Sequence, residues 1–235
     1  MYDLVVEYAR VNHLKLKEVY VPEWSGLFEN EKKVVVEGET YTPQIIKSEE
    51  CDLIPNSITK LPWREKLLRL IPAYSSRKLV IVRKDQIKIY QKVKDLAGKR
   101  AATQKATSFA TWLEGQNASA FKANPVRIDY VSEQDQLRNV DKKMADFTIY
   151  DADGALYAVK KSYPNLLVSL AIGDIDELCW ATDRSNVELA NSVEKFFDEQ
   201  KMDPKSYLNK VWKKYFDYSY KDYVDVISLG LKTAQ

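Results

Sequence analysis

The chain has 235 residues, 45% of them hydrophobic and 30% charged, which is typical of a soluble globular protein with one domain or two small lobes. Its 36 Lys and Arg against 34 Asp and Glu give a formal charge of +2, which excludes a global electrostatic attraction to nucleic acid or to an anionic membrane. Neither a transmembrane segment nor the pattern of a secretion signal is found, because the apolar runs fall far short of the ~20 residues that span a bilayer.

The cysteine and histidine content argues against a metal centre. Cys51 and Cys179 are too few and too far apart for a zinc cluster, and we expect them to be unpaired, as small hydrophobic residues of the interior. The single histidine, His13, excludes a site built from two or more histidines, and its context indicates the end of a helix. No metal and no cofactor are therefore predicted.

Hydrophobic periodicity along the first part of the chain predicts short elements and one clear strand. We expect a helix over residues 2–12, a strand over 14–21, a charged loop or hairpin from 29 that leads into a short helix after Thr42, a short buried strand at 52–55, an amphipathic stretch over 63–70 and a strand over 79–83.

Strands and helices then alternate. We expect strands after Leu96 and over 126–131, 147–150, 166–172 and 178–182, and helices from Ser108 and over 133–144 and 153–161. Two amphipathic helices, over 189–197 and 208–216, complete the chain. This alternation predicts an α/β fold with a largely parallel sheet and ligands at the strand ends.

A possible anion site follows the strand at 52–55. Ser57, Thr59 and Arg64 place two hydroxyl groups and a guanidinium near one strand end, and a guanidinium matches a carboxylate in geometry and charge. An ordinary solvated arginine that opens a helix is the alternative from the residue types alone.

Two further positions carry polar groups at element boundaries. Thr107 and Ser108 precede an apolar helical stretch, where they would cap the helix or hold an anion. Asp151 ends a strand, where its carboxylate would bind an ammonium group or form a turn. Near the C-terminus, lysines alternate with aromatic residues, but Trp212 falls on the apolar stripe of a helix, which favours a core over a nucleic-acid surface.

Several stretches, taken in order, resemble the bacterial extracellular solute-binding proteins of the polar amino acid type. They are residues 52–66 (DLIPNSITKLPWREK), 71–74 (IPAY), 79–84 (LVIVRK), 96–108 (LAGKRAATQKATS) and 145–151 (ADFTIYD). The tail at 214–225 resembles the non-catalytic binding module of the membrane-bound lytic murein transglycosylase F family. The catalytic Glu-Ser pair of those enzymes is absent from the sequence, so the resemblance implies a binding part and not an enzyme.

The resemblance implies a two-lobed periplasmic-binding-protein-like fold with two crossover strands. Lobe one would combine residues 1–81 with 172–235, and lobe two would be 82–171. The lobes would close on an amino acid or a small peptide, outside the cytoplasm or in the periplasm, as a monomer that serves an ABC transporter or an attached enzyme domain.

The resemblance also implies roles for individual residues. The positions that would hold the ligand carboxylate or contribute from the second lobe are Ser57, Thr59, Arg64, Thr107 and Ser108. Asp151 matches the residue that binds the α-ammonium group, and Trp24 matches an aromatic residue that stacks on the ligand.

The sequence also departs from the pattern of this group. It opens in what corresponds to the helix after the group's first strand, so the first lobe is expected to lack that strand. Ala106 stands where glycine is usual. Two alternatives stay open: a dehydratase-like enzyme on the same scaffold, with Asp151 as its acid or base, and an interaction module that has lost ligand binding.

Overall fold

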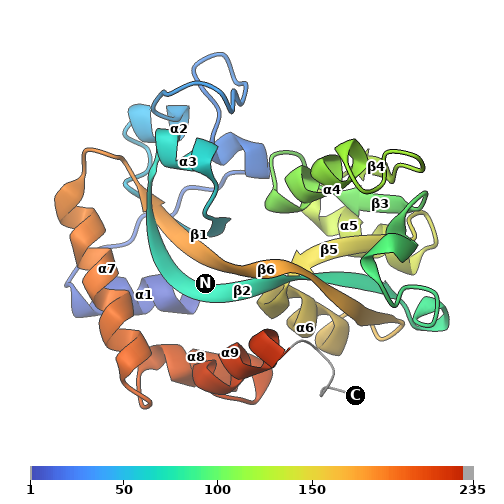
Figure 1. Ribbon diagram of the computed structural model, residues 1–235. Coiled ribbons are helices and arrows are strands. Elements are labelled where there is room, and N and C mark those ends of the chain that lie inside the picture. Colours follow the sequence, from blue (N-terminus) through green and yellow to red (C-terminus); the bar gives the residue numbers. More distant parts are fainter. Residues whose placement is uncertain (1, 230–235) are drawn as a thin grey trace. The chain divides into compact units, whose positions relative to one another are not determined.

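The computed structural model describes residues 2–229 and divides the chain into two compact units. Unit 1 consists of Met1–Ser75 and Asp176–Val224, and unit 2 of Ser76–Ile175 and Asp225–Gln235. Two long strands, β2 (Arg69–Arg83) and β6 (Leu166–Thr182), contribute residues to both units (Figure 1).

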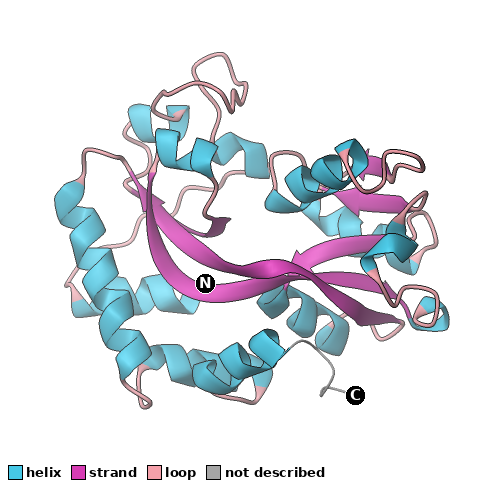
Figure 2. Cartoon of the chain, viewed as in Figure 1, coloured by secondary structure: helices cyan, strands magenta, loops and turns pink. Residues whose placement is uncertain are grey.

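Unit 1 contains mainly helices, with β1 and parts of β2 and β6 (Figure 2). Its other elements are α1 (Tyr2–Val11), the 3-10 helix η1 (Trp24–Leu27), α2 (Gln44–Lys47), β1 (Leu53–Thr59), α3 (Pro62–Leu67), α7 (Val187–Met202) and α8 (Tyr207–Phe216), together with the start of α9 (Tyr220–Leu229). One core cluster of this unit joins Ile54 and Ile58 of β1 to Leu27, Phe28 and Trp63.

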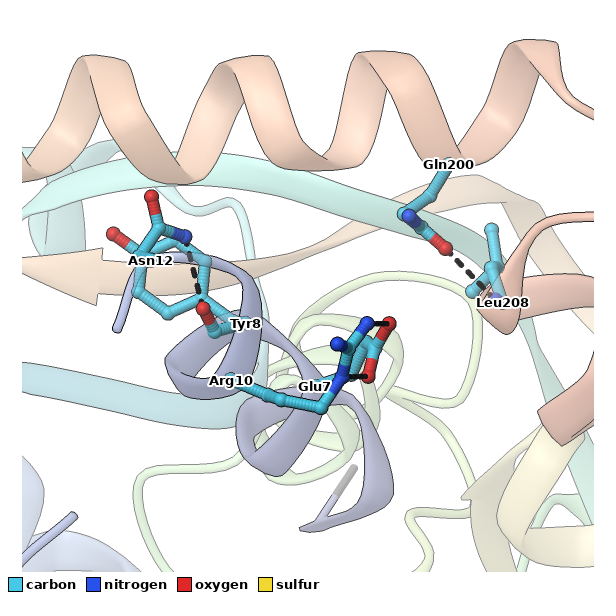
Figure 3. Close-up of polar contacts among 6 residues, drawn as sticks. All are labelled: Glu7, Tyr8, Arg10, Asn12, Gln200 and Leu208. Atoms are coloured by element: carbon cyan, nitrogen blue, oxygen red, sulfur yellow. Dashed lines mark hydrogen bonds and ion pairs between the residues drawn. The ribbon is translucent and has the colours of Figure 1, made fainter. Parts of the chain in front are cut away.

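Helix α1 packs against α8, which in turn packs against α7. Tyr8 of α1 lies edge-on to Phe196 of α7, with ring centroids 5.4 Å apart. Figure 3 shows the polar contacts of this region: Arg10 forms an ion pair with Glu7, and the backbone amide of Leu208 donates to the side-chain carbonyl of Gln200, where α7 leads into α8.

The end of α1 confirms the interpretation of His13. The side-chain amide of Asn12 donates to the Tyr8 carbonyl (2.9 Å, Figure 3), and His13 then adopts a φ of 54°, in the left-handed region that ends helices. The Leu14 amide still donates back to Ala9 (2.8 Å).

The predicted strand over 14–21 is wrong, because the segment forms neither a strand nor a helix. Among the described residues, no backbone hydrogen bond is recorded for residues 15–22, and Leu14, Leu16 and Tyr20 are exposed, Tyr20 to 85%. Alternating side chains form a strand only when a neighbouring strand supplies hydrogen bonds. In the described part of the chain, β1 is one of the two edge strands of the sheet and pairs only with β6.

Unit 2 holds the other strands around its own core. Its elements are two 3-10 helices, η2 (Lys84–Gln86) and η3 (Val93–Leu96), then β3 (Arg100–Thr103), α4 (Ser108–Ala118), β4 (Arg127–Tyr130), α5 (Glu133–Asp141), β5 (Phe147–Asp151) and α6 (Ala152–Lys161). The core includes Val80, Val82, Leu113, Phe147 and Ile149, all fully buried.

The sheet order is β1-β6-β2-β5-β3-β4, and it corrects the expectation of a largely parallel sheet. Strand β3 runs parallel to β4 and β5, whereas β1 is antiparallel to β6 and β2 is antiparallel to β5. The strands expected over 166–172 and 178–182 are one strand, β6, and the sequence analysis missed α9. The mixed α/β fold class itself is confirmed.

Both cysteines are unpaired, as predicted. The antiparallel register places Cys179 opposite Ile58, whereas Cys51 precedes the other end of β1. Over residues 2–229, no group of three or more His, Cys, Asp or Glu side chains is arranged to hold a metal ion. No helix within the same range is both long and apolar enough to cross a membrane.

Candidate functional site

The first part of the candidate site lies in unit 1, where β1 ends and α3 begins. Pro62 takes the first position of α3, where its missing N–H costs nothing. Arg64 follows in the first turn, and its side chain turns back so that Nη1 donates to the Thr59 carbonyl (2.9 Å). Arg64 is 0% exposed, so the alternative of a solvated arginine is wrong.

Three aromatic rings surround the Arg64 guanidinium. Its central carbon lies 4.9 Å from the ring centroid of Phe28, 5.1 Å from that of Trp63 and 5.7 Å from that of Trp24. The rings also contact one another edge-on, Phe28 with Trp63 at 5.2 Å and with Trp24 at 5.8 Å. We call these three rings the aromatic cage. A planar cation between aromatic faces is held in one orientation, at about 0.5–2 kcal/mol per contact.

Sequence reasoning assigned Trp24 to this region but missed Phe28 and Trp63. The available signal was spacing: Trp63 adjoins Arg64, and Phe28 lies four residues after Trp24. Such a pattern predicts a hydrophobic core equally well, and both residues do belong to the unit 1 core. Only the folded structure shows that the core also encloses a guanidinium.

The two hydroxyl residues of β1 have different surroundings. Ser57 is half-buried, and its Oγ forms a 2.7 Å hydrogen bond with the hydroxyl group of Tyr74 on β2. Thr59 is buried, and its backbone carbonyl is the group that accepts from Arg64. The sequence analysis did not single out Tyr74 as a site residue.

The second part of the candidate site lies in unit 2, at the N-terminus of α4. Thr107 is the N-cap: its Oγ1 accepts from the Ala110 amide (3.2 Å) and donates to the Gln104 carbonyl (2.8 Å), so the capping interpretation is confirmed. Ser108 is the first residue of the helix and is buried. The residue before the cap, Ala106, has a φ of 58°, a conformation that glycine adopts at lower cost.

Asp151 ends β5, where it pairs with Lys78 of β2, and it occupies the N-cap position of α6. Its carboxylate makes no capping hydrogen bond. The Ala152 amide donates instead to Ser76 Oγ (3.0 Å), and Ser76 Oγ donates to Asp153 (3.5 Å). The Ala152 amide, at the first position of α6, is therefore bound by a serine of β2.

The predicted site residues thus form two groups, each built within one unit. Those of unit 1 are Trp24, Ser57, Thr59 and Arg64, and those of unit 2 are Thr107, Ser108 and Asp151. The first group offers a cation and a hydroxyl group, and the second a helix N-terminus and a carboxylate.

The protein has the fold of the amino acid solute-binding proteins. An arginine-binding protein from T. maritima, a P235GK mutant, shows a TM-score of 0.71 and 21% identity over 92% of this chain and 84% of its own. A structure that belongs to the description of glutathione import via GshT and the cystine ABC importer TcyBC of Streptococcus mutans has a TM-score of 0.76. It is 20% identical to this chain, and the match covers 93% of this chain and 85% of its own. An ancestral amino acid-binding protein, a precursor of cyclohexadienyl dehydratase, has a TM-score of 0.72 and is 20% identical, with 92% of this chain and 84% of its own covered. The periplasmic-binding-protein-like fold expected from the sequence is confirmed.

In sequence, the chain is similar to membrane-bound lytic murein transglycosylase F. The protein of that name from Desulfosudis oleivorans is 25% identical over 228 residues, which cover 96% of this chain and 46% of the relative. The one from Methylobacillus flagellatus is 29% identical over 127 residues, 53% of this chain and 26% of the relative. The chain therefore spans about half the length of the first relative, and its match to the second covers about a quarter of that protein. No family model matches the sequence.

Proposed function

We propose that this protein is an extracytoplasmic solute-binding module that closes on an amino acid or a small peptide. The observation that carries the proposal is the buried Arg64, which is held by the aromatic cage and donates to the Thr59 carbonyl at the end of β1. A fixed guanidinium is the most selective protein group for a carboxylate, since it offers two parallel N–H donors. In this proposal Arg64, Ser57 and Thr59 bind the ligand carboxylate, and Trp24 adds an aromatic wall.

The groups of unit 2 are proposed to bind the rest of the ligand. The N-terminus of α4, with Thr107 and Ser108, favours negative charge, and the Asp151 carboxylate suits an ammonium group. A zwitterion carries both charges, so Arg64 of unit 1 and Asp151 of unit 2 would recognise its opposite ends, and the N-terminus of α4 would add to the binding of its carboxylate. The corresponding lobes are residues 1–81 with 172–235, and residues 82–171, and closure around the ligand would supply the affinity.

The comparisons support two kinds of downstream partner. Neighbours in fold include a protein of an ABC import system, which favours delivery to a transporter. The similarity to transglycosylase F favours an attached or docked cell-wall enzyme that responds to a bound cell-wall peptide. In either case we propose a monomeric module in the periplasm or outside the cytoplasm.

A dehydratase-like enzyme is the second candidate, because one neighbour in fold is a precursor of cyclohexadienyl dehydratase. In that reading Asp151 is a general acid or base, and its pKa would have to lie near the working pH. The third candidate, an interaction module without ligand, is supported by the segment over 15–22, which has no backbone hydrogen bond to the residues that the structure describes.

One experiment separates the three candidates. The protein is incubated with the twenty L-amino acids, glutathione, cystine, muropeptides and cyclic acids, and bound and recovered compounds are compared by mass spectrometry. The binding module predicts recovery of an unchanged compound, with affinity that falls in Asp151→Asn. Asp141→Asn is the control, because Asp141 lies elsewhere in unit 2 and accepts from Asn165.

Conversion of a compound that stops in Asp151→Asn would overturn the binding proposal in favour of the enzyme. Failure of every compound to bind the parent protein would favour the interaction module.

A further inference from the structure

The hydrogen bond between Ser57 and Tyr74 joins two strands that are not neighbours. Ser57 lies on β1 and Tyr74 on β2, and β6 lies between these strands in the sheet. The two hydroxyl oxygens are nevertheless 2.7 Å apart. The contact is made within unit 1, where β1 departs from its regular register with β6 between Ile54 and Ile58.

Tyr74 is held in place by its surroundings. It is 2% exposed, and its ring lies edge-on to Trp212 of α8, with centroids 5.1 Å apart and an interplanar angle of 70°. The next residue, Ser75, donates its backbone amide to the hydroxyl group of Tyr220 (2.9 Å), which fixes the strand at this point. Tyr220 also packs on Trp212, at 5.2 Å. The phenol hydroxyl is therefore a fixed point, whereas the half-buried serine has a rotatable side chain.

The chemistry of the two hydroxyl groups gives the bond a direction. The structure places the two oxygens within hydrogen-bond distance without fixing which one donates. A phenol is more acidic than an alcohol, which favours Tyr74 as the donor to Ser57 Oγ. A serine hydroxyl has only one hydrogen, and once its oxygen accepts from Tyr74, that hydrogen is left to donate to another acceptor. Successive hydrogen bonds of this kind, from Tyr74 to Ser57 and from Ser57 to a further acceptor, polarise and strengthen one another in a protein interior.

We propose that Tyr74 is a positioning residue that sets the Ser57 hydroxyl to donate to the ligand carboxylate. The inference rests on the proposed function, because it assumes that Ser57 contacts a carboxylate. Tyr74 itself does not contact the ligand in this proposal, and it acts only through Ser57.

A double-mutant cycle of Tyr74→Phe and Ser57→Ala tests the proposal in the full chain. Affinities for L-arginine, L-glutamate and glutathione are measured by calorimetry, and unfolding is followed in parallel. Tyr74→Phe keeps the ring that packs on Trp212 and removes only the hydroxyl group. We expect it to weaken binding about three- to tenfold in the parent and not at all in the Ser57→Ala background.

The chain contains a matched control. The hydroxyl group of Tyr8 donates to Ser192 Oγ (2.9 Å), in the same unit and between the same two residue types. Tyr8→Phe and Ser192→Ala should change stability but leave the affinity within experimental error.

The outcomes are distinct. Suppose that the parent binds at least one probe. If Tyr74→Phe binds that probe equally well, or if the substitution weakens binding equally in the parent and in the Ser57→Ala background, then Tyr74 does not act through Ser57. The inference then fails while the proposed function stands. If the parent binds none of the probes, the inference fails together with the proposed function for these ligand classes.

Discussion

Replacing Arg64 by lysine keeps the positive charge and removes the planar guanidinium, so it tests what the aromatic cage contributes. The guanidinium contacts three rings at 4.9–5.7 Å and donates to the Thr59 carbonyl at 2.9 Å. Each ring contact is worth about 0.5–2 kcal/mol, and a hydrogen bond from a charged donor about 1.5–3 kcal/mol. An ammonium group can keep one ring contact or the hydrogen bond, but it has no flat face to place between the rings.

At the lower ends of these ranges, the lysine variant should lose about 2 kcal/mol of unfolding free energy. For a chain of 235 residues this corresponds to a fall in melting temperature of roughly 4–8 °C. Under the proposed function, the affinity for carboxylate ligands should also fall more than about tenfold, because the two parallel donors are lost.

Calorimetry of unfolding and of binding measures both effects, with Arg10→Lys as the control. Arg10 is an exposed arginine of α1 that pairs with Glu7, so its replacement should change stability by less than ~0.5 kcal/mol. An Arg64→Lys variant that melts and binds like the parent would refute the reasoning about the cage. Unchanged affinity with reduced stability would assign Arg64 to the core alone.

Three further measurements check local features. Ala106→Gly should stabilise the protein by about 0.5 kcal/mol in chemical unfolding, because relief of a φ of 58° is worth about 1–2 kcal/mol and the added chain entropy costs about 0.5–1 kcal/mol. Thiol titration should find two free thiols in denaturant but slow reaction of Cys179 in the folded protein at pH 8, because burial raises the pKa of its thiol to about 12 and leaves almost no thiolate. Cys51, whose pKa is also raised by burial, should react slowly as well. In hydrogen exchange, the amides of residues 15–21 should exchange at nearly the rate of an unfolded peptide.

Each measurement has a result that contradicts its premise. Ala110→Gly, inside α4, should destabilise by about 1 kcal/mol, and equal effects at positions 106 and 110 would contradict the argument from φ. Fewer than two thiols under denaturing conditions would indicate a bridge. Slow exchange at residues 15–21, matching that of the bonded Leu14 amide, would show that the segment has a hydrogen-bonding partner in solution.

Local periodicity predicted most helices and strands, because the apolar face of each element is visible in the residue pattern of one short segment. The helix over residues 2–12 and the strand over 147–150 agree closely with α1 and β5. The strand over 14–21 failed for a non-local reason: its pattern is correct, but pairing depends on a neighbour that the segment itself does not specify. The same limit explains why the parallel and antiparallel pairings could not be assigned.

The candidate site was predicted in part. The residue types around Arg64 suggested an anion site, and the cap at Thr107 followed from the residue order. Burial of Arg64 could not be foreseen, because Trp24 and Phe28 reach it from a segment some forty positions earlier in the chain. The role of Tyr74 was hidden for the same reason, since its partner Ser57 lies on a strand with which β2 does not pair.

The division of the chain has a consequence for its synthesis on the ribosome. Residues 76–175 of unit 2 are contiguous and leave the ribosome as one stretch, whereas unit 1 needs both its N-terminal part and residues 176–224. The first 75 residues must therefore wait until about a hundred more have been made, and closing so long a loop adds an entropic cost. During this wait, the apolar side chains that later form the aromatic cage lack Ala181, the β6 residue of their core cluster. We expect nascent chains stalled near residue 175 to bind chaperones through their N-terminal part, and this binding to end once residue 224 has emerged.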